Sequence, residues 1–105
     1  MPASVTIRDV DKYEVFRSAT ARAVLETPGK TSRELRQAVA AGTAPPELVA
    51  LVEKIHSCAY TVTDRDLDVL RSSYSEDQLF EIIVAAAFGA AADRLATARR
   101  ALEMA

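Results

Sequence analysis

The sequence is poor in the residues that build covalent and redox sites. Its 105 residues contain no tryptophan and one cysteine, Cys58. A single cysteine excludes an internal disulfide, a multi-cysteine zinc site and a CxxC redox pair within one chain. With 3 glycines, 4 prolines and no repetitive tract, the composition also argues against global disorder and indicates one soluble globular domain.

Long apolar runs are absent too. The longest, IIVAAAFGAAA (82–92), is shorter than the roughly 18 to 20 residues that cross a bilayer. The first residues, MPASVTIRDVDKYEVF, carry charges early and lack the apolar segment of a signal peptide. We therefore expect a cytoplasmic protein with no membrane partner.

Neither positive nor negative charge predominates in the sequence. The formal net charge is −2, so no basic excess indicates a nucleic-acid partner. Arg94, Arg99 and Arg100 come nearest to a basic cluster. Because they lie near the end of a predicted helix, we expect them to complement the helix dipole.

The helical spacing of apolar residues and the capping patterns predict an all-α fold. About five helices, in a single domain of residues 1–105, are expected to pack around the C-terminal helix. Residues 1–8 are expected to be loose. The spacing of Tyr13, Phe16 and Val24 predicts a first helix from about residue 9 to 27, which Pro28-Gly29 terminates.

The C-terminal helix begins with Ser75 and Gln78, a capping-box spacing. Residues 79–84 are apolar nearly all round the helix, which predicts burial on every side. Gly89 costs about 1 kcal/mol relative to alanine in a helix, so another helix is expected to approach it closely. The AAAFGAAA run (85–92) leaves open whether that contact is internal or formed with a second copy of the chain.

Three shorter helices are predicted between these two. Thr31 with Glu34 predicts the cap of a helix that ends at Gly42. Pro45-Pro46 opens the next, whose expected core positions are Leu48, Leu51, Val52, Ile55 and Ala59. Thr63 is expected to cap the third, residues 64–73, whose buried side is Leu67, Val69 and Leu70.

Reactive side chains gather only at residues 53–58, where Glu53, His56 and Cys58 are the candidate catalytic residues. As a nucleophile, Cys58 would need a lowered pKa. It lies near the C-terminal end of its helix, where the dipole disfavours a thiolate, and His56 points to another side of that helix. A small buried hydrophobic role is therefore the favoured interpretation of Cys58.

Two patterns of possible metal ligands are better explained as solvent-exposed helix faces. Glu53 and His56 form E-x-x-H, as in di-iron bundles, but such sites need further carboxylates and a second motif. Asp64, Asp66 and Asp68 lack the glycine and the distal glutamate of a calcium loop. We expect no metal and no cofactor.

The segment AYTVTDRDLDVLRSSYSEDQLFEIIVAAAFGAAADRL, within residues 47–95, resembles the alkylhydroperoxidase-D-like, or carboxymuconolactone decarboxylase-like, family. Redox members of that family carry a glutamate, then C-x-x-C, then a histidine. Here Ile55 and Thr61 occupy the positions of a partner cysteine, and no histidine follows Cys58. The resemblance implies the family's all-helical fold and its assembly through helices, and it does not imply the enzymatic activity.

The sequence therefore favours a non-catalytic, homo-oligomeric helical protein of this type, either structural or binding a small molecule. The alternative is a one-cysteine redox or decarboxylase-like enzyme that uses Cys58, His56 and Glu53 with groups from a neighbouring subunit. A third interpretation, a helical module for a separate partner protein, would place an exposed apolar patch around Tyr13 and Phe16.

Overall fold

The computed structural model describes residues 18–104, and every regular element in that range is helical. Residues 18–25 form a helix. The elements after it are α2 (Arg33–Ala41), η1 (Pro46–Leu48), α3 (Val49–Cys58), η2 (Ala59–Thr61), α4 (Asp64–Asp68) and α5 (Glu76–Met104). The all-α prediction is confirmed for these residues. The predicted loose segment 1–8 and the patch around Tyr13 and Phe16 lie outside them.

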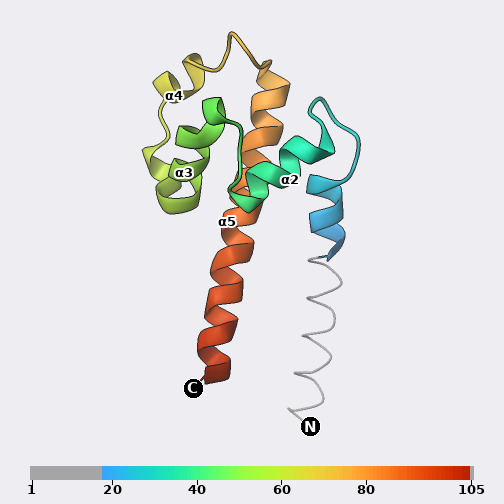
Figure 1. Ribbon diagram of the computed structural model, residues 1–105, viewed down its shortest axis with the longest axis vertical. Coiled ribbons are helices and arrows are strands. Elements are labelled where there is room, and N and C mark those ends of the chain that lie inside the picture. The colour runs from blue at the N-terminus through green and yellow to red at the C-terminus, as the bar shows by residue number, and fades with distance from the viewer. Residues whose placement is uncertain (1–17, 105) are drawn as a thin grey trace.

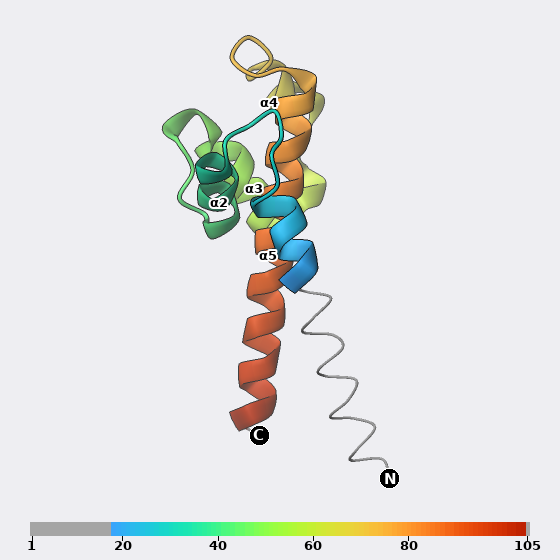
Figure 2. The same ribbon diagram turned by 90° about the vertical axis from the view of Figure 1, so that its right-hand side faces the viewer.

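Helix α5 is the axis of the molecule (Figure 1). Its first half is flanked by α3 and α4 on one side and by α2 and residues 18–25 on the other. Its second half extends beyond α2, α3 and α4 in both views (Figures 1 and 2). The core lies where the first half meets α2 and α3, and its members are Val39, Leu48, Leu51, Val52, Ile55, Leu70, Leu79, Ile82, Ala85 and Ala86.

Three helix ends form as the sequence predicts. The Ser75 hydroxyl accepts the backbone N–H of Gln78 at 3.1 Å, and the Gln78 amide oxygen accepts that of Ser75 at 2.8 Å. Thr63 and Asp66 make the same reciprocal pair at the start of α4. Gly42 ends α2 with φ 82°, a left-handed conformation that glycine adopts without steric cost.

Other boundaries differ from the predictions. The cap of α2 is Ser32, whose side chain accepts from Leu35 N, because the Thr31 hydroxyl is used elsewhere. The helix predicted over 64–73 ends at Asp68, and turns follow it. Val69 is therefore 71% exposed rather than buried, whereas Leu70 is 5% exposed as expected.

The helix after Pro45-Pro46 also differs in detail. It is divided into the 3-10 turn η1, helix α3 and the 3-10 turn η2. The predicted core positions Leu48, Leu51, Val52 and Ile55 are all buried. Ala59 is exposed, because the chain has left the α-helical path at η2 and the helical spacing no longer applies.

Helix α5 is not buried on every side. Leu79 and Ile82 are 3% and 0% exposed, but Phe80 is 68% exposed. The prediction for Phe80 is wrong because α2 and α3 cover only the inward side of α5. The apolar character of a helix does not determine which of its sides another helix covers.

Gly89 shows why the inward side carries small residues. A Cβ atom at this position would lie 2.0 Å from the backbone oxygen of Ala40 in α2. The predicted close approach of another helix is therefore confirmed, and the contact is made within the chain. Ala85, Ala86 and Ala90 are buried on the same side of α5.

Candidate functional site

The three candidate catalytic residues all lie on α3, but the structure does not bring their side chains together. Among residues 18–104, no hydrogen bond or ion pair joins any two of Glu53, His56 and Cys58. Glu53 is exposed and Cys58 is half-buried. The Thr61 hydroxyl, at the position of a partner cysteine, donates to the backbone oxygen of Cys58 at 2.7 Å.

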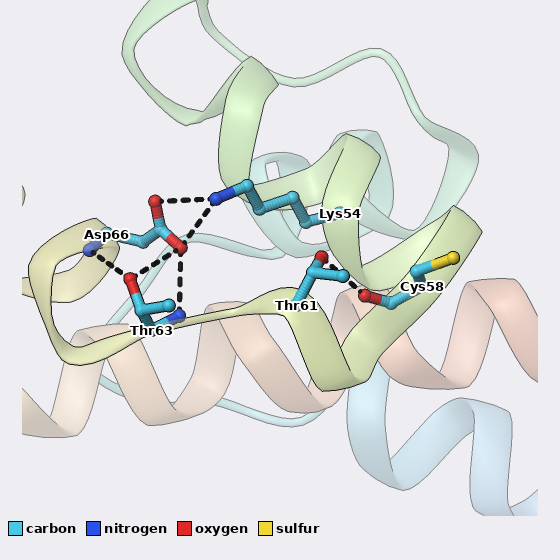
Figure 3. A network of polar contacts seen from close by, with 5 residues as sticks. All are labelled: Lys54, Cys58, Thr61, Thr63 and Asp66. Atoms are coloured by element: carbon cyan, nitrogen blue, oxygen red, sulfur yellow. Dashed lines mark hydrogen bonds and ion pairs between the residues drawn. The ribbon is translucent and has the colours of Figure 1, made fainter.

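Figure 3 shows the surroundings of Cys58. Its sulfur points away from Thr61 and away from the ion pair of Lys54 with Asp66. Lys54 is the one cation among the five residues drawn, and its ammonium is paired with both oxygens of Asp66. The geometry therefore agrees with a structural role for Cys58.

His56 faces α5 rather than Glu53. Its Nδ1 lies 3.9 Å from a carboxylate oxygen of Asp93, and its backbone oxygen accepts from Arg94 at 2.7 Å. Its Nε2 is buried and has no hydrogen-bond partner in the described part of the chain. Arg94, which the sequence analysis assigned to the helix dipole, thus links α5 to α3. No group of three metal-ligating side chains occurs within residues 18–104.

The Lys54–Asp66 pair joins α3 to α4. The Lys54 ammonium donates to both oxygens of Asp66, at 2.9 and 2.8 Å. Asp66 also accepts the backbone N–H of Thr63 at 2.9 Å. The hydrogen bond from Lys54, followed by that from Thr63, lowers the pKa of Asp66. Oδ1 of Asp66 accepts from Lys54 of α3, whereas Oδ2 accepts from both Lys54 and Thr63, so this network caps α4 and ties it to α3 (Figure 3).

A second polar cluster, which the sequence analysis missed, is centred on Glu81 of α5. Its carboxylate accepts the Thr31 hydroxyl at 2.6 Å, the Thr31 N–H at 2.9 Å and the Lys30 N–H at 2.7 Å. The Thr31 hydroxyl and the Lys30 N–H lower the pKa of Glu81, and Arg36 lowers it further by its charge. These bonds fix the loop before α2 onto α5.

Arg36 of α2 is the second member of this cluster. It is 4% exposed, and its terminal nitrogens donate to the backbone oxygens of Val24, at 2.9 Å, and of Thr27. Its Nε is buried without a hydrogen-bond partner among the described residues. A buried guanidinium ties residues 18–25 and their following loop to α2.

Arg36 and Glu81 also line a cavity of about 260 Å³. It lies between residues 18–25, the loop that follows them, α2 and α5. Its lining residues are Ala23, Val24, Thr27, Pro28, Gly29, Arg36, Phe80, Glu81 and Val84. Here a cation, an anion and apolar side chains border one hollow.

The sequence held a weak signal for both polar residues. Glu81 is the only charged residue between Leu79 and Ala92, and Arg36 shares a helix side with Val39, which is fully buried. A charge inside an apolar pattern indicates a buried polar contact. The partner could not be read from the sequence, because Thr31 lies 50 residues from Glu81.

The side of α5 opposite its buried face forms a continuous apolar surface, which we call the outer stripe. None of its seven residues is buried, and Phe80 and Leu102 are 68% and 77% exposed. Its members follow helical spacing of three and four, and they are Phe80, Val84, Ala87, Ala91, Leu95, Ala98 and Leu102.

None of the helices formed by residues 18–104 combines the length and the hydropathy that a bilayer span requires. Comparisons with protein-family models, with curated proteins and with solved structures find no match to this chain. The resemblance to the alkylhydroperoxidase-D-like family stays a prediction.

Proposed function

We propose that this chain is a non-catalytic helical protein of the alkylhydroperoxidase-D-like type that acts as a homo-oligomer, with the outer stripe of α5 as its contact between copies. The observation that carries the proposal is the exposure of this stripe. Large apolar side chains aligned along one helix face at 68% and 77% exposure are typical of an interaction surface.

The order of residues in the outer stripe favours a second copy of the same chain over an unrelated partner. The stripe is symmetric about Ala91: Leu95 and Ala87 lie four residues to either side of it, and the next two pairs are Ala98 with Val84 and Leu102 with Phe80. Two antiparallel copies related by a two-fold axis through Ala91 would therefore place each member opposite another member.

Residue size supports the same arrangement. In that pairing Leu95 meets Ala87, Val84 meets Ala98, and Ala91 meets its own copy. Each of these three central contacts joins a large residue to a small one or joins two small ones, which lets the backbones approach and the side chains interdigitate. Phe80 with Leu102 closes both ends of the contact.

A matched pair of charge substitutions tests the proposal. We expect the unaltered protein to have the mass of a dimer or a larger even assembly by light scattering. Ala91→Glu should reduce that mass to the monomer, because two carboxylates would meet on the axis. Ala50→Glu, on an exposed position of α3, should not change it. A monomeric unaltered protein, or an assembly that tolerates Ala91→Glu, would show the proposal to be wrong.

Cross-linking tests the two-fold axis itself. In a Cys58→Ser background, Ala91→Cys should form a disulfide between copies under mild oxidation, since a residue on the axis meets itself within the distance that a disulfide needs. Ala50→Cys in the same background should stay reduced. Equal cross-linking of both variants would refute the placement of the axis.

The separation of Cys58, His56 and Glu53 supports the non-catalytic part of the proposal over the one-cysteine enzyme. We expect Cys58 to react with a thiol reagent no faster than an unperturbed thiol. Rapid labelling with an apparent pKa well below about 8 would instead favour the enzyme.

A further inference from the structure

The cavity beside residues 18–25 borders the outer stripe of α5. Phe80 and Val84 belong to both, and Glu81 lies one residue after Phe80 on the cavity side. The opposite wall is formed by residues of the segment 23–29 and by Arg36 of α2. A second copy that packs on the outer stripe would therefore also meet residues from outside α5.

Helical geometry shows which residues of a second copy would reach this cavity. An α-helix has about 3.6 residues per turn, so residues eighteen apart share an angular position, five turns along the helix. Each α5 residue that lines the cavity has a counterpart of this kind in the second half of α5. The three pairs are Phe80 with Ala98, Glu81 with Arg99, and Val84 with Leu102.

The two-fold axis through Ala91 brings these counterparts to the cavity. Such an axis reverses the helix direction but leaves each flank of the stripe on the same side of the contact. Leu102 of the second copy then lies at the level of Phe80. Arg99 of the second copy lies about two residues, or roughly 3 Å along the helix axis, from the level of Glu81.

The charges of α5 support the same antiparallel orientation independently of residue size. Those of its first half are all acidic, and they are Glu76, Asp77 and Glu81. The second half has a basic excess, with Arg94, Arg99 and Arg100 against Asp93 and Glu103. Antiparallel copies place the acidic half against the basic half, whereas parallel copies would place like charges together.

The apolar part of the cavity wall suits Leu102 of the second copy. Val24 and Pro28 line the cavity on one side, and Phe80 lines it on the other. In a single chain Leu102 is 77% exposed, and Phe80 is 68% exposed. Contact between these side chains would remove apolar surface of both from water, which favours association.

The polar part of the wall suits Arg99 of the second copy. In Glu81, Oε1 accepts both bonds from Thr31, and Oε2 accepts the N–H of Lys30. A carboxylate oxygen can accept two hydrogen bonds, so Oε2 has capacity for one from an arriving guanidinium.

We propose that this cavity is a docking site for the second copy, in which Leu102 packs against the apolar wall and Arg99 binds Glu81. The inference rests on the proposed two-fold contact through α5. It adds the helix of residues 18–25 and the loop after it to that contact. By symmetry, the docking site occurs twice in each dimer.

Reversing the charge of adjacent arginines tests the polar part of the docking site. Arg99→Glu should raise the dimer dissociation constant at least about tenfold, because a carboxylate would then meet Glu81. Arg100→Glu makes the same change in net charge, but Arg100 shares the angular position of the buried Ile82, on the side opposite the stripe. It should change the constant by less than about twofold. Sedimentation over a dilution series measures both, and equal effects would overturn the proposal.

Exchanging a large and a small residue tests the apolar part. Ala23 lines the cavity but does not belong to the stripe, and Ala50 is an exposed helical alanine away from both. Ala23→Leu should weaken the dimer at least about tenfold, because its side chain would take the space of Leu102. Adding Leu102→Ala should restore part of this loss, whereas Ala50→Leu should have no effect. A dimer that Ala23→Leu does not weaken, or that Leu102→Ala does not rescue, would refute the docking site.

These variants separate the docking site from the contact on which it rests. If Ala91→Glu produces monomers while Ala23→Leu and Arg99→Glu leave the dimer intact, the two-fold contact stands and the docking site is wrong. If the unaltered protein is a monomer, both are wrong.

Discussion

The two sides of α5 carry similar residues and have opposite surroundings. The inward side has Ile82, Ala85 and Gly89, all buried against α2 and α3. The outer stripe has Phe80, Ala91 and Leu102 and no buried member, although its Phe80 and Val84 also border the cavity beside residues 18–25. Both sides are rich in alanine and free of charge, so polarity does not separate them.

Residue order separates them instead. On the inward side, the residue without a side chain, Gly89, lies where the backbone of Ala40 comes closest. On the outer stripe, residues are ordered symmetrically about Ala91, as a two-fold contact requires. One side is fitted to a neighbouring helix in the same chain, and the other is fitted to its own copy.

The largest difference between the two sides should appear when large side chains are truncated. Ile82 is 0% exposed, so Ile82→Ala should lower the free energy of unfolding by about 4 kcal/mol through lost burial and a residual cavity. Phe80→Ala should lower it by less than about 1 kcal/mol, because most of that ring is already in water. Urea unfolding at a concentration where both variants are monomeric measures the two values.

The same two variants should rank in the opposite order when self-association is measured instead of stability. Phe80→Ala should weaken self-association, whereas Ile82→Ala should leave the mass of the folded fraction unchanged. If Phe80→Ala cost as much unfolding free energy as Ile82→Ala in the monomer, the two sides would not differ in the way proposed.

A smaller effect is expected from adding one methyl group. Gly89→Ala should destabilise the chain by about 3 kcal/mol, because the new Cβ would overlap the backbone of Ala40, and this exceeds the roughly 1 kcal/mol gained in helix propensity. Ala50→Ser, on the exposed side of α3, is the control and should change the unfolding free energy by less than about 0.5 kcal/mol. Thermal unfolding followed by circular dichroism measures both. A stabilising Gly89→Ala would contradict the close α2–α5 packing.

The local parts of this architecture follow from the sequence. Two helix caps, Ser75–Gln78 and Thr63–Asp66, join residues three apart, and the left-handed Gly42 depends on a single backbone angle. The interactions that form them therefore lie within a short segment. Core positions of α3 follow for the same reason. Helical spacing fixes which residues share a face, and Leu51 and Ile55 are buried as expected.

The missed features depend on contacts between distant segments. The spacing within α5 shows that Phe80 and Ile82 lie on different sides, but only the positions of α2 and α3 decide which one is buried. Glu81 and Arg36 read as surface charges until the loop that contains Thr31 is placed against α5. The residues around Cys58 are candidates because of their types alone, whereas the cavity at Arg36 is formed by residues from distant parts of the chain.

The smallest effect expected concerns the carboxylate between these two sides of α5. The hydrogen bonds from Thr31 and Lys30, together with the charge of Arg36, lower the pKa of Glu81 below its ordinary value of 4.5. The folded state therefore favours the ionised form. This contribution to stability is present above about pH 4.5 and is lost as the pH falls through the lowered pKa of the folded state. Glu81→Gln should be less stable than the unaltered protein at pH 7, and the difference should stay constant down to about pH 4.5 and shrink below it. The lowered pKa values of Glu47 and Asp66 act in both proteins, so the difference isolates Glu81.

Glu103→Gln, near the exposed end of α5, is the matched control and should show no such trend. Urea unfolding from pH 7 to 3 measures it. A difference between the two proteins that stays constant from pH 7 to 3 would mean that the carboxylate charge does not hold the loop on α5.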